Sequence, residues 1–171
     1  MLLLRKEGGQ SLRARGFSLI ELVFVVIVIA IIVAVAAPRL SNAAQRSRNT
    51  SVLATFGTIE NAAEMYRAVN GNLPHDYGPG STHAAFASYV DTSIFLKPTL
   101  LGGQWDWNNV VNSSGAPVSF WTTHGPNVSI NLNPSPIARW TAFDRFADDG
   151  SLTTGKFTRV TTHLIRKVPR D

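Results

Sequence analysis

Cysteine is absent from this sequence of 171 residues. Its absence excludes a disulfide framework, thiol chemistry, a cysteine-based zinc site and a bacterial lipoprotein anchor. The four histidines, His75, His83, His124 and His163, are dispersed without metal-ligand spacing, and we expect them at the surface or in loops. No serine, histidine and aspartate set and no carboxylate pair indicates catalysis. The sequence therefore gives no support for an enzyme.

A cluster of basic residues is also lacking. The net charge is +5, but four of the sixteen basic residues, against one acidic residue, precede Gly16. Beyond Gly16, twelve basic residues face ten acidic ones, and these charges are scattered. Nucleic-acid binding needs a basic stripe or patch, so we expect no nucleic acid as a partner.

Polar side chains are missing from residues 22–37, a run of sixteen apolar residues. A helix that spans a membrane needs about 20 apolar residues. Residues 17–37 supply that length, interrupted only by Ser18 and Glu21. Within a bilayer the backbone must satisfy its own hydrogen bonds, which favours a helix over a strand. The sequence thus predicts a soluble domain that carries a transmembrane helix.

The basic residues of the first sixteen positions favour a cytoplasmic location for this end of the helix. Arg39, Arg46 and Arg48 follow the apolar run and weaken that bias. We therefore expect a single-pass membrane protein with its N-terminal end in the cytoplasm and its C-terminal domain on the other side of the membrane.

Two simpler interpretations of the apolar run are a plain membrane anchor and a cleaved secretory signal peptide. The segment 34–36, Ala-Val-Ala, has the small-x-small form that a signal peptidase accepts. Glu21 argues against both, because a carboxylate inside an apolar segment is costly unless it finds a partner. Neither an anchor nor a disposable signal peptide has a use for it.

Residues 16–22, Gly-Phe-Ser-Leu-Ile-Glu-Leu, resemble the processing motif of type IV pilins and type II secretion pseudopilins. The resemblance implies that a prepilin peptidase cuts between Gly16 and Phe17 and methylates the new amino terminus. It also implies that Glu21, the fifth residue of the mature chain, serves assembly. Proline is common at the twenty-second mature position of that family, where Pro38 stands. For location, the resemblance implies the bacterial inner membrane, with the C-terminal domain on the periplasmic side. The resemblance covers residues 5–74 and leaves the rest of the chain open.

Beyond Pro38, which should kink or loosen the helix, the helical pattern continues to residue 70. An apolar stripe with alternating spacings of four and three residues predicts a face that packs on the C-terminal domain; it contains Val52, Phe56, Ile59, Ala63 and Tyr66. Gly71 suits a left-handed helix cap, and Pro74 blocks continuation. The expected organisation is a leader (1–16), a transmembrane and assembly helix (17–37), an amphipathic helix (38–70) and a globular domain (71–171).

Residues 71–171 predict a small α+β domain with an antiparallel sheet. Ser81 and Thr82 could cap a short helix, and residues 136–147 predict a second helix that starts at Ser135-Pro136. Residues 118–122 and 128–132 read as two strands of a hairpin, and residues 156–165 as a last strand. Trp105 and Trp107 lie in a segment that we interpret as an irregular loop, with at least one of the two buried.

Asp144, Asp148 and Asp149 stand directly before Gly150 and suggest calcium. Their spacing does not match the helix–loop–helix calcium pattern. A solvated helix end followed by an Asp-Gly turn is therefore the favoured interpretation, with calcium as the alternative and no other cofactor expected.

The favoured function is a structural subunit of a type IV pilus-like or secretion pseudopilus filament, with the membrane, prepilin peptidase and other subunits as partners. The alternative is a membrane-tethered periplasmic binding module that is processed in the same way but does not polymerise. Glu21 separates the two, because a monomer has no neighbour to pair with it. The sequence does not indicate which machine the subunit serves, nor whether it is a major or a minor subunit.

Overall fold

The structure, a computed structural model, describes residues 16–82, 84–112, 114–133 and 136–168. Residues 1–15 of the expected leader, His83 and Ser135 lie outside these ranges. The chain divides into two compact units, Met1–Ala43 and Ala44–Asp171. Each unit is described by itself below.

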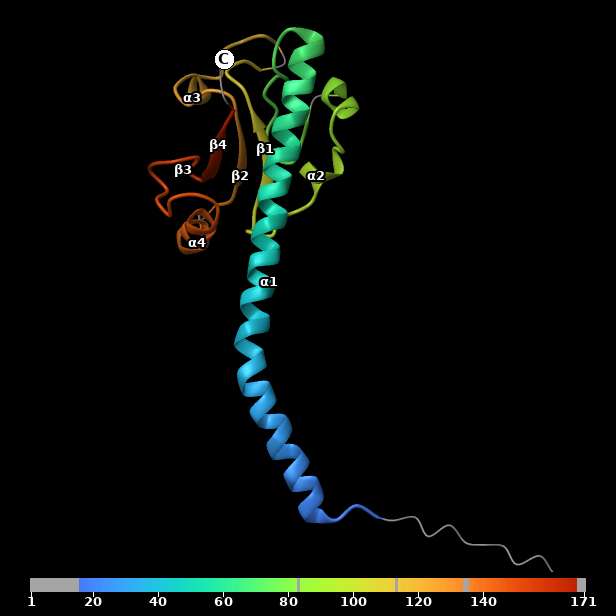
Figure 1. Cartoon of the computed structure of the whole chain (residues 1–171). Helices are drawn as coiled ribbons and strands as arrows, with labels where there is room; N and C mark the ends of the chain where they lie inside the picture. Colours follow the sequence, from blue (N-terminus) through green and yellow to red (C-terminus); the bar gives the residue numbers. More distant parts are fainter. Residues whose placement is uncertain (1–15, 83, 113, 134–135, 169–171) are drawn as a thin grey trace, which may run out of the picture. The chain divides into compact units, whose positions relative to one another are not determined.

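Helix α1, Leu19–Asn70, contributes to both units (Figure 1). It begins two residues later than the sequence predicts and ends where expected. Pro38 lies inside the helix, which continues on both sides of it. At the C-terminal end the Gly71 N–H donates to the carbonyl oxygen of Arg67 over 2.8 Å, with Gly71 at a φ of 77°. Glycine is required there because other residues rarely adopt that φ, and the predicted left-handed cap is confirmed.

The first unit contributes residues 16–43 to the described structure, and every one of their side chains is exposed. An eighteen-residue window within α1 reaches a mean hydropathy of 3.3, with none of the window buried. Length and composition therefore make α1 a candidate membrane span, as the sequence predicts. An exposed apolar surface of this size needs lipid or protein around it.

The second unit contains a four-stranded antiparallel sheet. Its strands are β1 (Gln104–Asn108), β2 (Asn127–Asn131), β3 (Phe157–Val160) and β4 (His163–Lys167). They lie in the order β1-β2-β4-β3, with Trp105 opposite Ile130 and Ile130 opposite Leu164. The predicted α+β class with an antiparallel sheet is confirmed.

Both outer edges of the sheet bond to neighbouring loops. Along β1, the Thr99 N–H donates to Gly103 O over 2.8 Å and the Gly80 N–H donates to Trp105 O over 3.1 Å. Along β3, the Arg159 N–H donates to Leu152 O over 2.7 Å. Loop backbone thus occupies positions at which another strand could pair.

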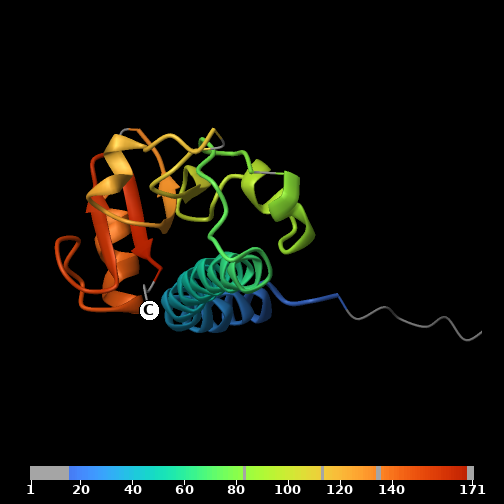
Figure 2. The same ribbon diagram turned by 90° about the horizontal axis from the view of Figure 1, so that it is seen from above.

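The C-terminal part of α1 covers one face of this sheet. Figure 2 shows the other elements of the second unit on a single side of α1. All five residues of the predicted stripe are buried: Val52, Phe56, Ile59, Ala63 and Tyr66. Phe56 is central, with its ring centroid 4.8 Å from that of Trp105 and 5.0 Å from that of Phe157. The stripe therefore forms one wall of the core.

The opposite face of the sheet carries a band of buried polar side chains. In the strand register, Asp106 stands opposite Ser129, and Asn108 opposite Asn127. All four side chains are buried, and Trp121 adds a buried aromatic ring to the same face. Buried polar groups require partners, so this face is held by specific hydrogen bonds rather than by apolar packing alone.

Within the described residues, the second unit also contains four helical elements: η1 (Ala84–Ser88), α2 (Ser93–Leu96), α3 (Ser119–Thr122) and α4 (Ile137–Ala147). α4 confirms the helix predicted at 136–147 and buries Trp140 and Phe143 in the core. The short helix predicted after Ser81 and Thr82 is the 3₁₀ helix η1, and the Ser81 hydroxyl donates to Gly78 O instead of capping it. At the start of α2, the Asp91 carboxylate accepts the Ser93 N–H over 2.9 Å. Neither α2 nor this hydrogen bond was predicted from the sequence.

Two strand predictions and the predicted hairpin need correction. Residues 118–122 form the helical turn of α3, so they do not form a hairpin with β2, which pairs instead with β1 and β4. Helical geometry lets Trp121 reach the polar face of the sheet, where its ring centroid lies 5.2 Å from that of His163. The expected strand 156–165 is two strands, β3 and β4, because the chain reverses at Thr161 with a φ of 49°.

The two tryptophans in the segment expected to be a loop lie on strand β1. Both Trp105 and Trp107 are buried, so the expectation that at least one is buried is confirmed. The Trp107 Nε1–H donates to Pro74 O over 3.0 Å, which ties β1 to the chain just beyond α1. The prediction of an irregular loop was wrong, because the alternation of tryptophan and polar residues in this segment has the two-residue period of a strand.

Candidate functional site

The segment Gly16–Ser18 lies outside any helix or strand and leads directly into α1. All three residues are exposed, and the Phe17 side chain is 78% exposed. A Cβ placed on Gly16 would meet no heavy atom within 4 Å. Within the described part of the chain, nothing therefore crowds the bond between Gly16 and Phe17, which suits a peptide bond that an enzyme is to bind and cut.

Ser18 and Glu21 cap the start of α1. The carbonyl oxygen of Ser18 accepts the N–H groups of Glu21 and Leu22, both at 3.1 Å. In return, the Ser18 N–H lies 3.4 Å from Oε2 of Glu21. The Glu21 side chain thus has a role within its own chain that resembles one half of a capping box. The Ser-x-x-Glu spacing signals this cap in the sequence, and our sequence analysis overlooked it.

The buried polar face of the sheet holds an ionisable pair, Asp106 and His163. The distance from Asp106 Oδ2 to His163 Nε2 is 3.6 Å. Burial raises the pKa of Asp106, and the hydrogen bond and charge of His163 oppose that rise. Beside this pair, the Asn108 amide donates to Asn127 Oδ1 over 3.0 Å and to Ser129 Oγ over 2.9 Å. His163 was expected at the surface or in a loop, but it opens strand β4 and is largely buried.

Asp76 lies near this pair, and burial raises the pKa of its carboxyl to about 6 although the Asn109 N–H donates to it. A folded-state pKa above the unfolded value means that the folded state holds the proton more tightly. The stability that this proton contributes is complete below about pH 4 and is lost as the pH rises through 6.

We therefore expect the melting temperature of the wild type to fall more between pH 4 and 7 than that of Asp76→Asn. Thermal unfolding at a series of pH values measures this, and parallel curves would contradict the assignment.

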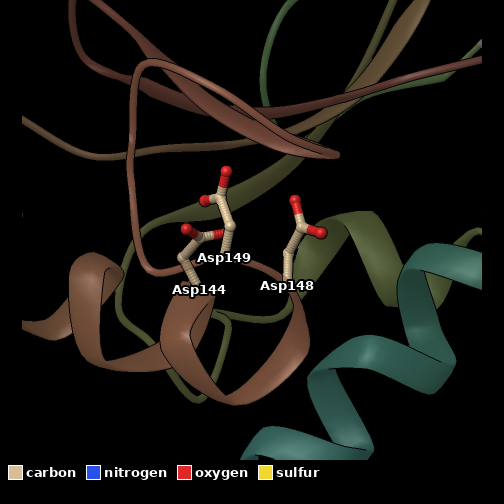
Figure 3. Close-up of side chains that lie close together, drawn as sticks. All are labelled: Asp144, Asp148 and Asp149. Carbon is tan, nitrogen blue, oxygen red and sulfur yellow. The ribbon is translucent and has the colours of Figure 1, made fainter.

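Asp144, Asp148 and Asp149 come together at the end of α4. Each offers a carboxylate oxygen, and these oxygens lie within 4.8 Å of one another. Figure 3 shows the three carboxyl groups on the same side of the end of the helix. The spacing brings them together because positions four apart share one face of a helix and Asp149 follows Asp148 directly.

Asp144 departs most from the solvated helix end that the sequence suggested. Its side chain is 0% exposed, while Asp149 is exposed. Neither oxygen of Asp144 accepts a hydrogen bond of normal geometry within the described part of the chain. Burial and, after it, the carboxyls of Asp149 and Asp148 raise the pKa of Asp144 to about 6, although the Gly150 N–H opposes the rise. The end of α4 therefore brings one buried carboxyl group and two more accessible ones into a site that could hold a cation.

The comparisons with known proteins concern the N-terminal segment. A family model described as the prokaryotic N-terminal methylation motif matches residues 11–37. No curated protein matches the chain, and no solved structure matches it. The matched range contains the open Gly16–Phe17 bond, the Ser18–Glu21 cap and the apolar part of α1 in the first unit.

The apolar start of α1 and this motif together fit a single-pass protein of the inner membrane. They also support a type IV pilin-like processed protein, and a structural role rather than a catalytic one. In residues 11–37 this chain carries the prokaryotic N-terminal methylation motif, which is the signal of type IV pilins and pseudopilins.

Proposed function

We propose that the chain is a structural subunit of a type IV pilus-like or type II secretion pseudopilus filament. The observation that carries the proposal is the methylation motif on an exposed peptide bond directly before an exposed apolar helix. A prepilin peptidase would cut between Gly16 and Phe17 and methylate Phe17. The helix would hold the subunit in the inner membrane, with the second unit on the periplasmic side, until it joins other subunits.

The peptide bond after Gly16 suits cleavage for a steric reason. Glycine has no side chain and leaves the backbone free to take the extended form that an active site binds. Phe17 and Ser18 separate the bond from the first turn of α1, so cutting would not require the helix to unfold.

Polymerisation would account for the apolar surface of the first unit. Large side chains are exposed all along it, from Leu19 to Val35. Lipid covers such a surface before assembly, and the helices of neighbouring subunits would cover it in a filament. The second unit does not need neighbouring subunits to complete its core, because residues 52–66 of α1 already close that core.

Processing is the direct test of the proposal. The mature protein should begin at Phe17 and carry one methyl group on its amine, which the intact mass of membrane-extracted protein will show. Gly16→Leu should retain the leader, because a bulky side chain would hinder access to the bond. Gly9→Leu, a matched change elsewhere in the leader, should be processed normally. A mature start at Ala37, or a chain that keeps Met1 despite co-expression with a prepilin peptidase, would overturn the proposed processing.

A further inference from the structure

A shallow apolar groove lies along α1 where the apolar run of the sequence ends. Arg39 and six apolar side chains line it, and its volume is about 740 Å³. The apolar members are Ile31, Ile32, Val35, Ala36, Leu40 and Ala43. Most of them recur at intervals of four residues and therefore share one face of the helix. All belong to the first unit and are exposed, so the groove is open to whatever surrounds that unit.

Arg39 stands where a membrane-spanning helix would meet the lipid headgroups. Residues 19–37 of α1 extend over about 28 Å, at about 1.5 Å per residue. That length matches the hydrocarbon core of a bilayer, which is about 30 Å thick and is bounded on each side by roughly 5–7 Å of headgroups. Arg39 follows Ala37 by two residues, or about 3 Å, and so falls within the headgroup layer.

The geometry of a helix directs the Arg39 side chain back toward the bilayer. In an α-helix the Cα–Cβ bond tilts toward the N-terminus, so a long side chain lies over the preceding turn. For Arg39 that turn carries Val35 and Ala36, which line the same groove. The aliphatic stem can therefore cover apolar surface while the guanidinium reaches the layer of lipid phosphates.

The first unit offers Arg39 no carboxylate nearby. Residues 22–59 contain neither aspartate nor glutamate. Glu21 precedes Arg39 by eighteen residues, which is about 27 Å along a helix. The next acidic residue, Glu60, pairs with Arg166 over 3.0 Å. Within the described part of the chain no ion pair engages Arg39, so an anionic partner would come from its surroundings.

We propose that this groove binds an anionic phospholipid, with the phosphate on the Arg39 guanidinium and an acyl chain against the apolar side chains that precede it. Arginine suits a phosphate because its planar fork of N–H donors binds two oxygens at once. A lipid such as phosphatidylglycerol joins a phosphate to acyl chains, just as the groove joins a cation to apolar side chains. A zwitterionic headgroup fits less well, because its own ammonium repels the guanidinium. The proposal rests on membrane insertion and does not depend on filament assembly.

The test is native mass spectrometry of the full chain in a mild detergent, titrated with phosphatidylglycerol or, separately, with phosphatidylcholine. The wild-type monomer should retain phosphatidylglycerol preferentially. Arg39→Gln should bind that lipid about five-fold more weakly, since one basic residue contributes about 1 kcal/mol at an anionic surface. Equal binding of phosphatidylglycerol by the two proteins would overturn the proposal, as would equal retention of both lipids by the wild type. Dimers that exclude lipid would overturn it in favour of a second copy in the groove.

Three further variants separate a lipid site from a general attraction of basic residues to anionic lipid. Arg46→Gln is the matched control, because Arg46 is exposed on the same helix but follows the apolar run by nine residues rather than two. It should bind phosphatidylglycerol as the wild type does, and a loss as large as that of Arg39→Gln would contradict a site at Arg39. Arg39→Lys keeps the charge and should retain most of the binding. Ala36→Leu fills the groove without changing any charge and should weaken the binding of both lipids, so unchanged binding would contradict the groove.

Discussion

Replacing Glu21 with alanine is expected to reduce the yield of filaments by roughly two to three powers of ten while leaving membrane insertion intact. After cleavage, Phe17 would present a cationic amine just before α1, in the same apolar surroundings as the Glu21 carboxylate. Between neighbouring subunits in a filament the two charges could pair. Removing one partner of such a buried pair costs about 3–5 kcal/mol, which corresponds to that loss in an assembly constant. The measurement is the yield of sheared filaments, normalised to the membrane content of each variant.

The contact of Glu21 with Ser18 offers a competing explanation, namely that alanine merely weakens the helix cap. That contact is long, at 3.4 Å, and exposed, so it should contribute no more than about 1 kcal/mol. A charge pair between subunits would therefore outweigh it. Two substitutions separate the effects of capping and charge.

Glu21→Gln keeps a side chain that can accept the Ser18 N–H but removes the charge, so it should lose filaments as alanine does. Ser18→Ala keeps the charge and the backbone N–H that contacts Glu21 but replaces serine, a preferred N-cap residue, so it should assemble nearly normally. Glu21→Asp should be intermediate, because its carboxylate is one methylene shorter. Normal filaments from Glu21→Ala would favour a tethered periplasmic module that does not polymerise.

Phe56→Ala should destabilise the second unit by about 3–5 kcal/mol, the usual cost of removing a buried phenylalanine ring. Phe56 is 0% exposed and packs edge-on against Trp105 and Phe157, so its loss opens a cavity between α1 and the sheet. For a unit of this size the melting temperature should fall by about 10–20 °C. Thermal and denaturant unfolding of a chain that begins at Ala44 would measure the change.

Met65→Ala is the control on the same helix. Met65 is 59% exposed, so its truncation should change stability by no more than about 0.5 kcal/mol. Equal effects of the two substitutions would mean that α1 does not pack on the sheet through the buried stripe. The comparison isolates burial because both residues lie on one helix and lose large side chains.

The long helix could be predicted because its signals repeat many times. The apolar run and the stripe from Val52 to Tyr66 each extend over several turns, and Gly71 supplies a cap signal at the C-terminal end of α1. Residues 118–122 offered only one valine and two aromatic side chains. A four-residue turn such as α3 is too short for periodicity, and the contact of Trp121 with His163 on the polar face of the sheet joins residues that are far apart in the sequence.

The candidate functional sites also divide into features that the sequence predicts and features that it does not. Gly16, Phe17 and Glu21 were recognisable from local order alone, because the motif is contiguous. The proximity of Asp144 and Asp148 follows from helical spacing, but the burial of Asp144 does not. That burial depends on the loop 149–156, which folds back over the end of α4. There the backbone N–H of Lys156 donates to the Asp148 carboxylate. The reversal at Thr161 carried no glycine, asparagine or proline signal, so the separation of β3 from β4 was not visible.

The loops that bond to both edges of the sheet affect how the protein behaves at high concentration. Open edges allow proteins to aggregate irreversibly into cross-β material, which grows without any cellular machinery. Here the backbone of Gly80 and Thr99 occupies the β1 edge, and that of Leu152 contacts β3. Under the proposed function, subunits crowded in the periplasm would thus be protected from amyloid-like deposits. Their association would instead depend on the apolar helices, which the membrane would keep apart until assembly.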